Sequence, residues 1–580
     1  MVKRILVAIT GLFMMMASPA LAQQAEGLWF GTLEVDAATS LAIVVEISRD
    51  GDGALTGTID SPDQNAFGMP LTEVSGEDGK LAFVQAAIGA RYEAGWNADK
   101  QAWTGTFFQG GFSWLLDLTA GRQEDRREPV LLPAEWEIPA DTALGDLLAR
   151  RIAGREGAGI VAAVLEPGEN GPVTRIVSRG PYSDAGFDGD TVFEIGSMTK
   201  VFTALLLTDM ALKGEVSLDD PVARYLPDGA VMPTRNGAEI TLSQLSHQIS
   251  GLPRLPDNMP YGDPDDPYAD YTEALLLEFL GRYALTRDIG GQYEYSNLGV
   301  GLLGYVLARA AGEPDYESLV RHRILYPLGM QDTAITLTPG MQGRFATPHD
   351  IYMRPASPWA IPVIGGAGAL RSTANDMLIF LAATLDPQSP IGPAMELAVA
   401  ERYVPGEGAQ YPLGWMLARA PSGDVLHHGG GTGGFRTHMA VQPARNRAVV
   451  VLTNAAIEPS ASDIAMHMIT GMPPAHETPV PPPPSPAPVR EEVSLDPAQL
   501  AHVAGTYAMA PGMVMNVVLS DDGLTAQLSG QPAFPIFAMG PLEFFLKVVD
   551  ARLVFSETDG VVTGATLFQN GREIPMERNQ

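Results

Sequence analysis

The sequence contains no cysteine. Disulfides, thiolate catalysis and cysteine-based metal sites are therefore excluded, and so is a lipoprotein anchor, which needs a cysteine to carry its lipid. Lysine is also scarce, since it occurs at only six positions: Lys3, Lys80, Lys100, Lys200, Lys213 and Lys547. A motif that uses a lysine consequently carries more weight here than it would in an ordinary composition.

Basic residues are few in general. The chain has 37 Lys and Arg against 68 Asp and Glu, a formal net charge of −31. Such a surface repels phosphate backbones and anionic lipid, which argues against nucleic-acid binding as the main function. Hydrophobic residues make up 46% of the chain and charged residues 18%, a composition that can build cores and is unlike that of a disordered chain. The 580 residues suggest about three or four domains.

Long apolar runs are missing after the N-terminus, so no membrane anchor is predicted for the mature chain. At the N-terminus, Lys3 and Arg4 precede an apolar run that begins at Ile5, and Ala20-Leu21-Ala22 is a small-residue cleavage pattern. This arrangement is typical of a secretory signal peptide over residues 1–22, cleaved after Ala22. We therefore expect a periplasmic or secreted protein.

Short alternating runs separated by turn signals predict an all-β domain over residues 23–122. Leu28–Val35, Leu41–Ser48 and Ala102–Phe108 have the strand pattern, and Asp78-Gly79 is a hairpin dipeptide. The β pattern returns in 491–580, where Asp-Gly and Asn-Gly dipeptides again mark turns. A sandwich or barrel fits this spacing in the N-terminal domain.

The region between these two β domains, residues 140–472, mixes helices and strands. Thr199–Leu212 is apolar almost all round and predicts a buried helix, and Val449–Leu452 suits a central strand. Linkers are predicted over 123–139 and over 473–490, the second because nine prolines lie between Pro473 and Pro488.

Ser197 and Lys200 form the only S-x-x-K motif in the chain. At the start of a helix, residues i and i+3 share a face, so both side chains can reach one cleft. A serine hydroxyl is a poor nucleophile without a base, and a lysine can serve as that base if burial lowers its pKa. A helix-capping serine with a solvated lysine is the alternative, but the residues that follow Lys200 are those of a core helix.

Tyr295 and Asn297 form the only Y-x-N motif, just before another apolar helix. A tyrosine can act as a base or proton shuttle beside a cation, which Lys200 can supply. An asparagine amide can hold a substrate carbonyl or orient the lysine. A tyrosine packed at a loop is the structural alternative.

A glycine-rich segment, His427 to Gly434, is the third candidate element. Its glycines let the backbone approach a ligand closely, and a strand edge there can present an N–H to an oxyanion. A flexible turn is the alternative. His427 and His428 lack a third ligand at a recognisable spacing, so neither a metal site nor a cofactor is predicted.

In order and separation, these three elements resemble the serine β-lactamase and penicillin-binding-protein superfamily, specifically its class C-like branch. Further matches are LSQLSHQISGLP (242–253), LYPLGMQDT (325–333), GGAGALRSTANDM (365–377), YPLGWML (411–417) and VVVLTN (449–454). The resemblance covers about residues 140–472. It implies an α+β fold in which an antiparallel sheet is flanked by helices, here with all-β domains before and after it.

The resemblance also implies roles for individual residues. Ser197 is the acylated nucleophile, and Lys200 and Tyr295 share the general base and acid duties. Asn297 binds substrate or positions Lys200. The backbone N–H groups of Ser197 and Gly431 form the oxyanion hole, and the third motif, a further substrate-binding element, is His428-Gly429-Gly430.

One departure from the family pattern concerns substrate. Class C β-lactamases have Lys-Thr-Gly in the third motif, whereas this chain has His428 followed by glycines, and a neutral histidine is a weaker carboxylate partner than lysine. The resemblance therefore implies a peptidase or esterase, or a weak β-lactamase, acting on a small peptide, an ester or a β-lactam-like substrate. The acidic loop 254–271 follows the SGLP turn. It either overhangs the cleft, where it would favour cationic substrates, or is only a solvated loop.

The flanking domains also resemble known ones. The last 90 residues are similar to a lipocalin-like domain attached to peptidases of this branch, and the N-terminal segment is similar to a β domain of secreted hydrolases. Two other functions stay open: a catalytically weak sensor or binding protein for cell-wall fragments, and an acyltransferase that uses the same acyl-serine. The sequence leaves the oligomeric state open.

Overall fold

The structure is a computed structural model that describes residues 25–35, 40–64, 66–109, 112–122, 130–169, 171–180, 187–260, 262–263, 265–404, 410–483, 490–510, 513–520, 523–528, 533–547, 549–569 and 572–579. The expected signal peptide, 1–22, lies outside the described residues, as do 123–129 of the first expected linker and 484–489 of the second. Among the described residues, no helix has the length and apolar character needed to span a bilayer.

The N-terminal part is a nine-stranded antiparallel meander. Its strand order is β4-β3-β2-β1-β9-β8-β7-β6-β5, so the first and last strands pair in the middle and the ends of the sheet are the consecutive strands β4 and β5. The three strand patterns noted in the sequence correspond to β1, β2 and β8. The strands are β1 (Gly27–Glu34), β2 (Ser40–Arg49), β3 (Leu55–Ser61), β4 (Ala66–Pro70), β5 (Glu73–Glu77), β6 (Lys80–Gln85), β7 (Ala90–Asn97), β8 (Ala102–Gln109) and β9 (Phe112–Ala120).

The central part is built on a six-stranded antiparallel sheet with the order β11-β10-β21-β20-β19-β18. All seven residues of β21 are buried, as predicted for a central strand. The strands are β10 (Ile160–Gly168), β11 (Gly171–Arg179), β18 (Met416–Ala418), β19 (Val425–Gly431), β20 (Arg436–Gln442) and β21 (Arg447–Thr453). Three short strand pairs accompany it: β12 (Phe193–Glu194) with β15 (Arg371–Ser372), β13 (Thr234–Arg235) with β14 (Ala238–Glu239), and β16 (Arg402–Tyr403) with β17 (Tyr411–Pro412).

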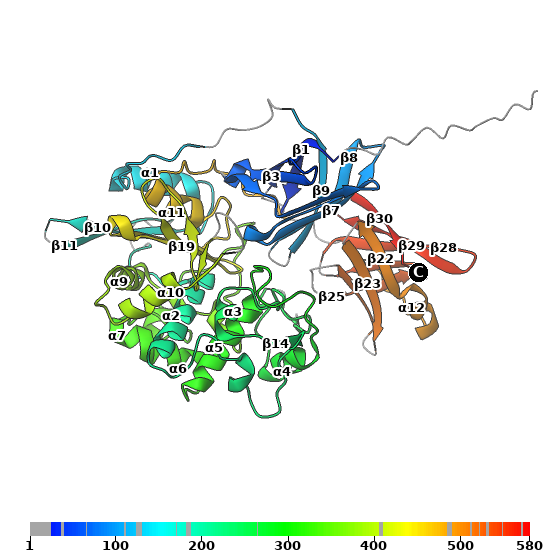
Figure 1. Ribbon diagram of the computed structural model, residues 1–580. Coiled ribbons are helices and arrows are strands. Elements are labelled where there is room, and N and C mark those ends of the chain that lie inside the picture. Colours follow the sequence, from blue (N-terminus) through cyan, green and yellow to red (C-terminus); the bar gives the residue numbers. More distant parts are fainter. Residues whose placement is uncertain are drawn as a thin grey trace, which may run out of the picture.

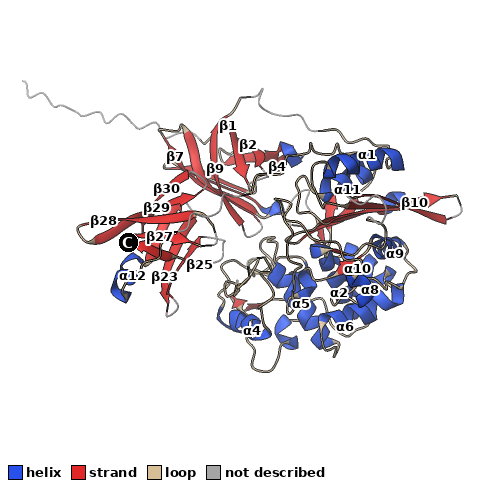
Figure 2. Cartoon of the chain, turned by 180° about the vertical axis from the view of Figure 1, so that it is seen from behind, coloured by secondary structure: helices blue, strands red, loops and turns tan. Residues whose placement is uncertain are grey.

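Helices cover both faces of this sheet (Figures 1 and 2). Because side chains alternate along a strand, Ile160, Ala162 and Val164 of β10 face one helical layer, whereas Val161 and Ala163 face the other. The first layer consists of α1 (Asp141–Ile152) and α11 (Ala461–Thr470). The second belongs to a larger helical region: α2 (Thr199–Leu212), α3 (Leu242–Ser246), α4 (Glu273–Arg282), α5 (Asn297–Ala310), α6 (Tyr316–Val320), α7 (Tyr326–Leu328), α8 (Pro339–Gln342), α9 (Ala374–Leu385) and α10 (Gly392–Ala400).

The C-terminal part opens with α12 (Pro497–Val503) and continues as a second nine-stranded meander. Its order is β25-β24-β23-β22-β30-β29-β28-β27-β26, the same arrangement of first to ninth strand as in the N-terminal sheet. The strands are β22 (Gly505–Ala510), β23 (Met513–Ser520), β24 (Gly523–Leu528), β25 (Ala533–Pro535), β26 (Phe537–Gly540), β27 (Glu543–Leu546), β28 (Ala551–Thr558), β29 (Val561–Gln569) and β30 (Arg572–Arg578).

The two β domains also share a local device in their first strands. In each, the third residue is a buried aromatic whose side chain donates to the carbonyl four residues earlier: Trp29 Nε1 to Ala25 O at 2.8 Å, and Tyr507 Oη to Val503 O at 2.6 Å. A buried indole N–H or phenol O–H needs such a hydrogen-bond partner. The β domains are therefore alike in topology and in how the first strand is anchored.

The N-terminal sheet lies between the central part and the C-terminal sheet in both views, with β8 against β22 (Figures 1 and 2). The described ends of the two expected linkers pack on the central part. Trp136 Nε1 donates to Met468 O at 3.1 Å, and Arg155 Nη2 donates to Thr478 O at 2.6 Å.

A buried ion pair connects α1 to α11, and it gives a stability prediction. Arg151, whose side chain is fully buried, donates from Nη1 and Nη2 to the two carboxylate oxygens of Asp463 at 2.7 and 2.8 Å. Arg151→Met leaves that carboxylate uncompensated, and we expect the free energy of unfolding to fall by about 3 kcal/mol in urea denaturation. Arg224→Met, which breaks the exposed Arg224–Asp220 pair, should cost no more than about 0.5 kcal/mol. Equal losses in the two variants would contradict this account.

Candidate active site

Ser197 lies in a short 3₁₀ turn, Gly196–Met198, that leads directly into α2. Gly196 has a φ of +53°, a conformation that favours glycine, and it turns the chain from β12 into the helix. Thr199 Oγ1 donates to Gly196 O at 2.7 Å and accepts the Leu370 N–H at 3.2 Å. These two hydrogen bonds hold the turn in place. The nucleophile candidate therefore sits at the N-terminal end of a helix, where backbone N–H groups favour negative charge.

Lys200 is the buried cation candidate of the site. It is only 1% exposed, and its Nζ lies 2.9 Å from Ser197 Oγ, 2.9 Å from Asn297 Oδ1 and 2.6 Å from Ala367 O. Burial lowers its pKa well below that of an ordinary lysine, and the positive charge of Arg254 lowers it further.

The three neighbours of Lys200 Nζ suit a neutral amine, which has two N–H donors and one lone pair. The N–H groups can donate to Asn297 Oδ1 and Ala367 O, which are both acceptors here. Nζ is placed as a donor to Ser197 Oγ at 2.9 Å, and a neutral amine at the same distance can instead accept the hydroxyl proton. In its neutral form, Lys200 is therefore placed to take the Ser197 proton.

Tyr295 lies on the other side of the serine and hydrogen-bonds to it. Burial raises the pKa of its phenol to about 12, although the Ser197 hydrogen bond and the charge of Arg254 act in the opposite direction. Lys200 Nζ is 4.8 Å and Arg254 Cζ 5.2 Å from the centre of its ring. At neutral pH, Tyr295 is consequently a proton donor.

Asn297 begins α5, and Ser296 caps that helix by accepting the Gly299 N–H at 2.8 Å. Both polar atoms of the Asn297 amide form hydrogen bonds. Oδ1 accepts from Lys200 Nζ, and Nδ2 donates to Tyr268 Oη at 3.0 Å. Asn297 thus fixes the lysine and connects it to loop 254–271.

The glycines of β19 allow the sheet to meet the serine turn. A Cβ on Gly196 would lie 2.7 Å from Gly431 N, and a Cβ on Gly430 would lie 2.0 Å from Ile195 O. Any larger residue at these positions would force the strand and the turn apart. The backbone of Gly431 is therefore beside that of Ser197, as an oxyanion hole formed by these two N–H groups requires.

His428 is buried beside Lys200, and its Nδ1 is 2.6 Å from Gly429 O. A carbonyl accepts only from an N–H, so Nδ1 carries the proton and Nε2 has the lone pair. Burial lowers the pKa of His428 to about 3 and that of His427 to about 4, and it also lowers the pKa of His438 well below its ordinary value. The rings of His427 and His438 stack with their centres 5.3 Å apart. Within the described part of the chain, no three His, Asp or Glu side chains are grouped to hold a metal.

A cleft opens in front of Ser197. Aromatic side chains form one wall, where the rings of Tyr268 and Trp359 are 5.3 Å apart, and Ile361 and Ala367 add apolar surface. The lining residues are Gly196, Ser197, Tyr268, Asn297, Trp359, Ile361, Ala367, Gly368, Gly431 and Thr432.

Loop 254–271 reaches the cleft, but its described part contributes an aromatic side chain there and no carboxylate. Trp359 Nε1 donates to Asp265 O at 3.0 Å, and Asp266 accepts the Ala360 N–H at 3.0 Å. Asp257 pairs instead with Arg282. Tyr261, which the sequence also suggested, lies outside the described residues. The expected preference for cationic substrates therefore has no support from the lining of the cleft.

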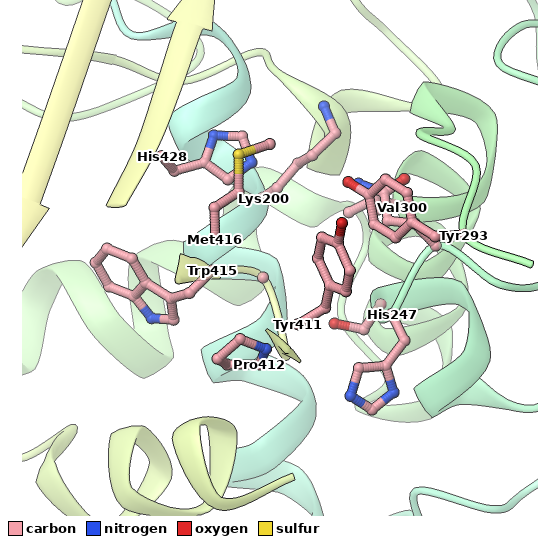
Figure 3. Close-up of a pocket in the computed structure, with 12 residues that line it drawn as sticks. Lys200, His247, Tyr293, Val300, Tyr411, Pro412, Trp415, Met416 and His428 are labelled. Carbon is pink, nitrogen blue, oxygen red and sulfur yellow. The ribbon is translucent and has the colours of Figure 1, made fainter. Parts of the chain in front are cut away.

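Lys200 and His428 also line a second pocket (Figure 3). The rings of Tyr293 and Tyr411 stack there with their centres 4.3 Å apart. The remaining lining residues are Ser246, His247, Gln248, Val300, Pro412, Gly414, Trp415 and Met416. Tyr293 is two residues before Tyr295 and thus connects this pocket to the segment that carries Tyr295.

Comparison with known proteins identifies the family. The beta-lactamase family model matches residues 146–469, which is more than half of the chain. The chain belongs to the beta-lactamase family. It is accordingly a serine hydrolase of the group that includes penicillin-binding proteins. A second model, a domain of unknown function (DUF3471), matches residues 489–578.

Two curated relatives illustrate the match. The chain is 34% identical over 282 residues to the D-alanyl-D-alanine-carboxypeptidase/endopeptidase AmpH of Escherichia coli K12, which covers 46% of this chain and 71% of AmpH. It is 24% identical over 412 residues to penicillin-binding protein 4* of Bacillus subtilis, which covers 66% of this chain and 87% of that protein. A crystal structure of a beta-lactamase/D-alanine carboxypeptidase from Yersinia pestis complexed with citrate aligns at 26% identity and a TM-score of 0.48, over 57% of this chain and 97% of that chain.

The structure brings all the predicted site residues into one region, including the three motif segments. Sequence reasoning missed the walls and supports of the site: Trp359, Ile361, the carbonyl of Ala367, and Arg254. Ala367 lies within the matched segment GGAGALRSTANDM (365–377) and Arg254 directly follows LSQLSHQISGLP (242–253), so position in or beside a motif was the available signal. Trp359 offered none.

The buried histidines predict a pH-dependent stability. In the folded chain the pKa is about 4 for His427 and about 3 for His428, and burial also lowers the pKa of His438 well below the ordinary value of about 6.5, so the unfolded state binds more protons below pH 6.5. Stability should fall as the pH drops from 6.5 towards 4, by up to about 1.4 kcal/mol per pH unit for each histidine. In urea titrations at several pH values, His438→Phe should reduce that slope by one histidine's share. The exposed His476→Gln is the control, and an unchanged slope in His438→Phe would refute the assignment.

Proposed function

We propose that the protein is an exported serine hydrolase that cleaves amide or ester bonds through an acyl-enzyme on Ser197. The observation that carries this proposal is the 2.9 Å contact between Ser197 Oγ and Nζ of a fully enclosed lysine. An activated serine of this kind needs a base within hydrogen-bond reach, and Lys200 fulfils that requirement.

In the proposed acylation, Lys200 Nζ accepts the Ser197 proton as Oγ attacks the substrate carbonyl. The backbone N–H groups of Ser197 and Gly431 hold the negative charge that develops on the carbonyl oxygen. Asn297 Oδ1 and Ala367 O stabilise the ammonium that forms on Lys200, because both accept hydrogen bonds from it. The charge thus moves between groups that are already in place.

Collapse of the tetrahedral intermediate expels the leaving group, which takes its proton from the Tyr295 hydroxyl, while the Lys200 ammonium returns a proton to the tyrosine. In the second half, a water molecule attacks the acyl-serine and gives up its proton to the same pair of residues. Ser197 Oγ then leaves with a proton, and the acid product is released. Every proton is returned, so no cofactor is needed in this scheme.

The substrate we propose is a small peptide or ester whose acyl group lies against Tyr268, Trp359 and Ile361. His428, neutral at physiological pH, offers a carboxylate no charge at the third motif, so efficient β-lactam hydrolysis is not expected. Similarity to AmpH favours D-alanine-terminated peptides, and cell-wall fragments are then the natural source.

Two cations lie near the Tyr295 ring. Lys200 Nζ is 4.8 Å from the ring centre, and Arg254 Cζ is 5.2 Å from it.

Export is part of the proposal and is supported by the basic start, apolar run and Ala-Leu-Ala site of residues 1–22. A periplasmic or secreted location would put the enzyme in contact with cell-wall peptides. We also propose that residues 140–472 are the catalytic domain and that a lipocalin-like domain follows the proline-rich linker.

The test uses the mature chain and three substrates: a chromogenic cephalosporin, a short-chain nitrophenyl ester and a D-alanine-terminated peptide, with intact-protein mass recorded in parallel. We expect turnover of the ester or peptide to exceed that of the cephalosporin. Ser197→Ala should lower kcat/KM by at least about 10³-fold, because the nucleophile is removed. Ser217→Ala, at an exposed serine outside the cleft, is the matched control.

Full activity of Ser197→Ala on every substrate would overturn the proposal. A stable adduct on Ser197 without turnover would instead favour a sensor of cell-wall fragments. Faster product formation with an added amine or alcohol, together with its acylated product, would assign acyl transfer.

A further inference from the structure

One turn of the N-terminal β domain lies directly against the segment that carries Tyr295. Gly89, at the end of the 3₁₀ turn Ala86–Ile88, has no side chain to separate it from Tyr293, and a Cβ there would lie 2.4 Å from Tyr293 O. This contact joins residues 204 positions apart in sequence and lies two residues from the catalytic tyrosine.

The turn is held rigidly from within its own domain. Gln85 is buried, and its side chain uses both ends: Oε1 accepts the Ile88 N–H at 2.9 Å and Nε2 donates to Pro70 O at 3.2 Å. Gln109 Nε2 donates to Ile88 O at 3.3 Å. Two glutamine amides of the β domain therefore fix the turn that faces Tyr293, and it can act as a firm support.

The catalytic segment is held from the opposite side by the central domain. Glu294 N donates to Gln248 O at 2.8 Å, and Ser296 N donates to Gln248 Oε1 at 2.5 Å. The Tyr293 ring stacks on Tyr411, and Ser296 Oγ donates to Pro253 O at 2.6 Å. Residues 293–296 are thus enclosed between the central domain and the Gly89 turn.

Charge at the same contact points in the same direction. Glu294 pairs with Arg287, with 2.5 Å between Nη1 and Oε2. Burial raises the pKa of the Glu294 carboxyl, and the positive charges of Arg287 and of Arg91, which follows Gly89 by two residues, partly offset that rise. The positive charge of Arg91 in the β domain therefore also acts on the Glu294 carboxyl.

We propose that the N-terminal β domain is a working part of the catalytic unit, in which the turn at Gly89 presses on Tyr293 and so positions Tyr295 against Ser197. The domain is not catalytic itself, because none of its described residues lines the cleft in front of Ser197. Gly89 is a positioning residue. This inference rests on the proposed function, since it assigns the N-terminal domain a part in the proton transfer by Tyr295.

The physical reason is the short reach of proton transfer. The Tyr295 hydroxyl must stay within hydrogen-bond distance of Ser197 and of the leaving group, and a displacement of about 1 Å can cost up to about 10²-fold in rate. A Cβ that meets Tyr293 O at 2.4 Å must move either the turn or the segment, because both atoms belong to backbone or near-backbone groups. Substrate binding in the cleft should change less, because Tyr268, Trp359 and Ile361 belong to other segments.

The test compares Gly89→Asn with Gly79→Asn in the full-length mature chain. Both glycines lie in turns of the same β domain with positive φ, +60° and +73°, and asparagine tolerates that conformation well. A Cβ at Gly79 would meet nothing within 4 Å, so this variant carries the backbone change without the contact. Steady-state kinetics with the best substrate should show kcat at least about tenfold lower in Gly89→Asn, with KM within about twofold of the parent. Gly79→Asn should match the parent in both.

Hydrogen exchange provides a second measurement that general destabilisation would not mimic. In Gly89→Asn, the amides of Glu294 and Ser296 should exchange faster than in the parent, while those of the β10–β21 ladder keep their protection. Equal kcat and equal exchange in the two variants would overturn the positioning role, whereas persistent turnover in Ser197→Ala would instead overturn the proposed function. A uniform loss of protection in Gly89→Asn would show that the turn stabilises the fold and not the tyrosine, and would also refute the inference.

Discussion

The site depends on the enclosure of one lysine. An ammonium group in an apolar interior loses its hydration, so burial favours the neutral amine and converts a poor base into an effective one. Lys200 is placed on α2 among buried residues, and its two acceptors, Asn297 Oδ1 and Ala367 O, come from two other segments. The packing of α2 against α5 and the turn at 365–367 therefore sets the chemistry of Ser197, because these elements exclude water from Nζ.

The same enclosure requires very close approaches between backbones. β19 meets the serine turn where Gly430 faces Ile195 O and Gly196 faces Gly431 N, and neither position has room for a Cβ. Glycine is thus required on both sides of Ser197, the proposed nucleophile, for reasons of space. The buried His428 beside Lys200 is neutral at physiological pH, whereas a cation in its place would lower the pKa of Lys200 further.

Much of the fold was predictable because its signals are local. The alternation of β1, β2 and β8, the apolar helix Thr199–Leu212 and the β-branched run in β21 each follow from short-range periodicity, and the α+β class is confirmed. The contacts that complete the site are not local. Trp359, Ala367 O and the approach of Gly89 to Tyr293 depend on how distant segments pack, which no spacing in the sequence records. The shared strand order of the two β domains could not be predicted from the sequence either, because turn dipeptides mark where strands end and not which strands pair.

The scarcity of lysine makes the central claim directly measurable. With lysine labelled by ¹⁵N at Nζ, the mature chain gives at most five signals, since Lys3 belongs to the expected signal peptide. The Nζ resonance that is lost in Lys200→Arg should become that of a neutral amine at a pH well below the ordinary lysine pKa of about 10.4, because burial lowers the pKa of Lys200. If the Lys200 signal stayed that of an ammonium up to pH 10, Lys200 would not be the base, and the account of this active site would be wrong.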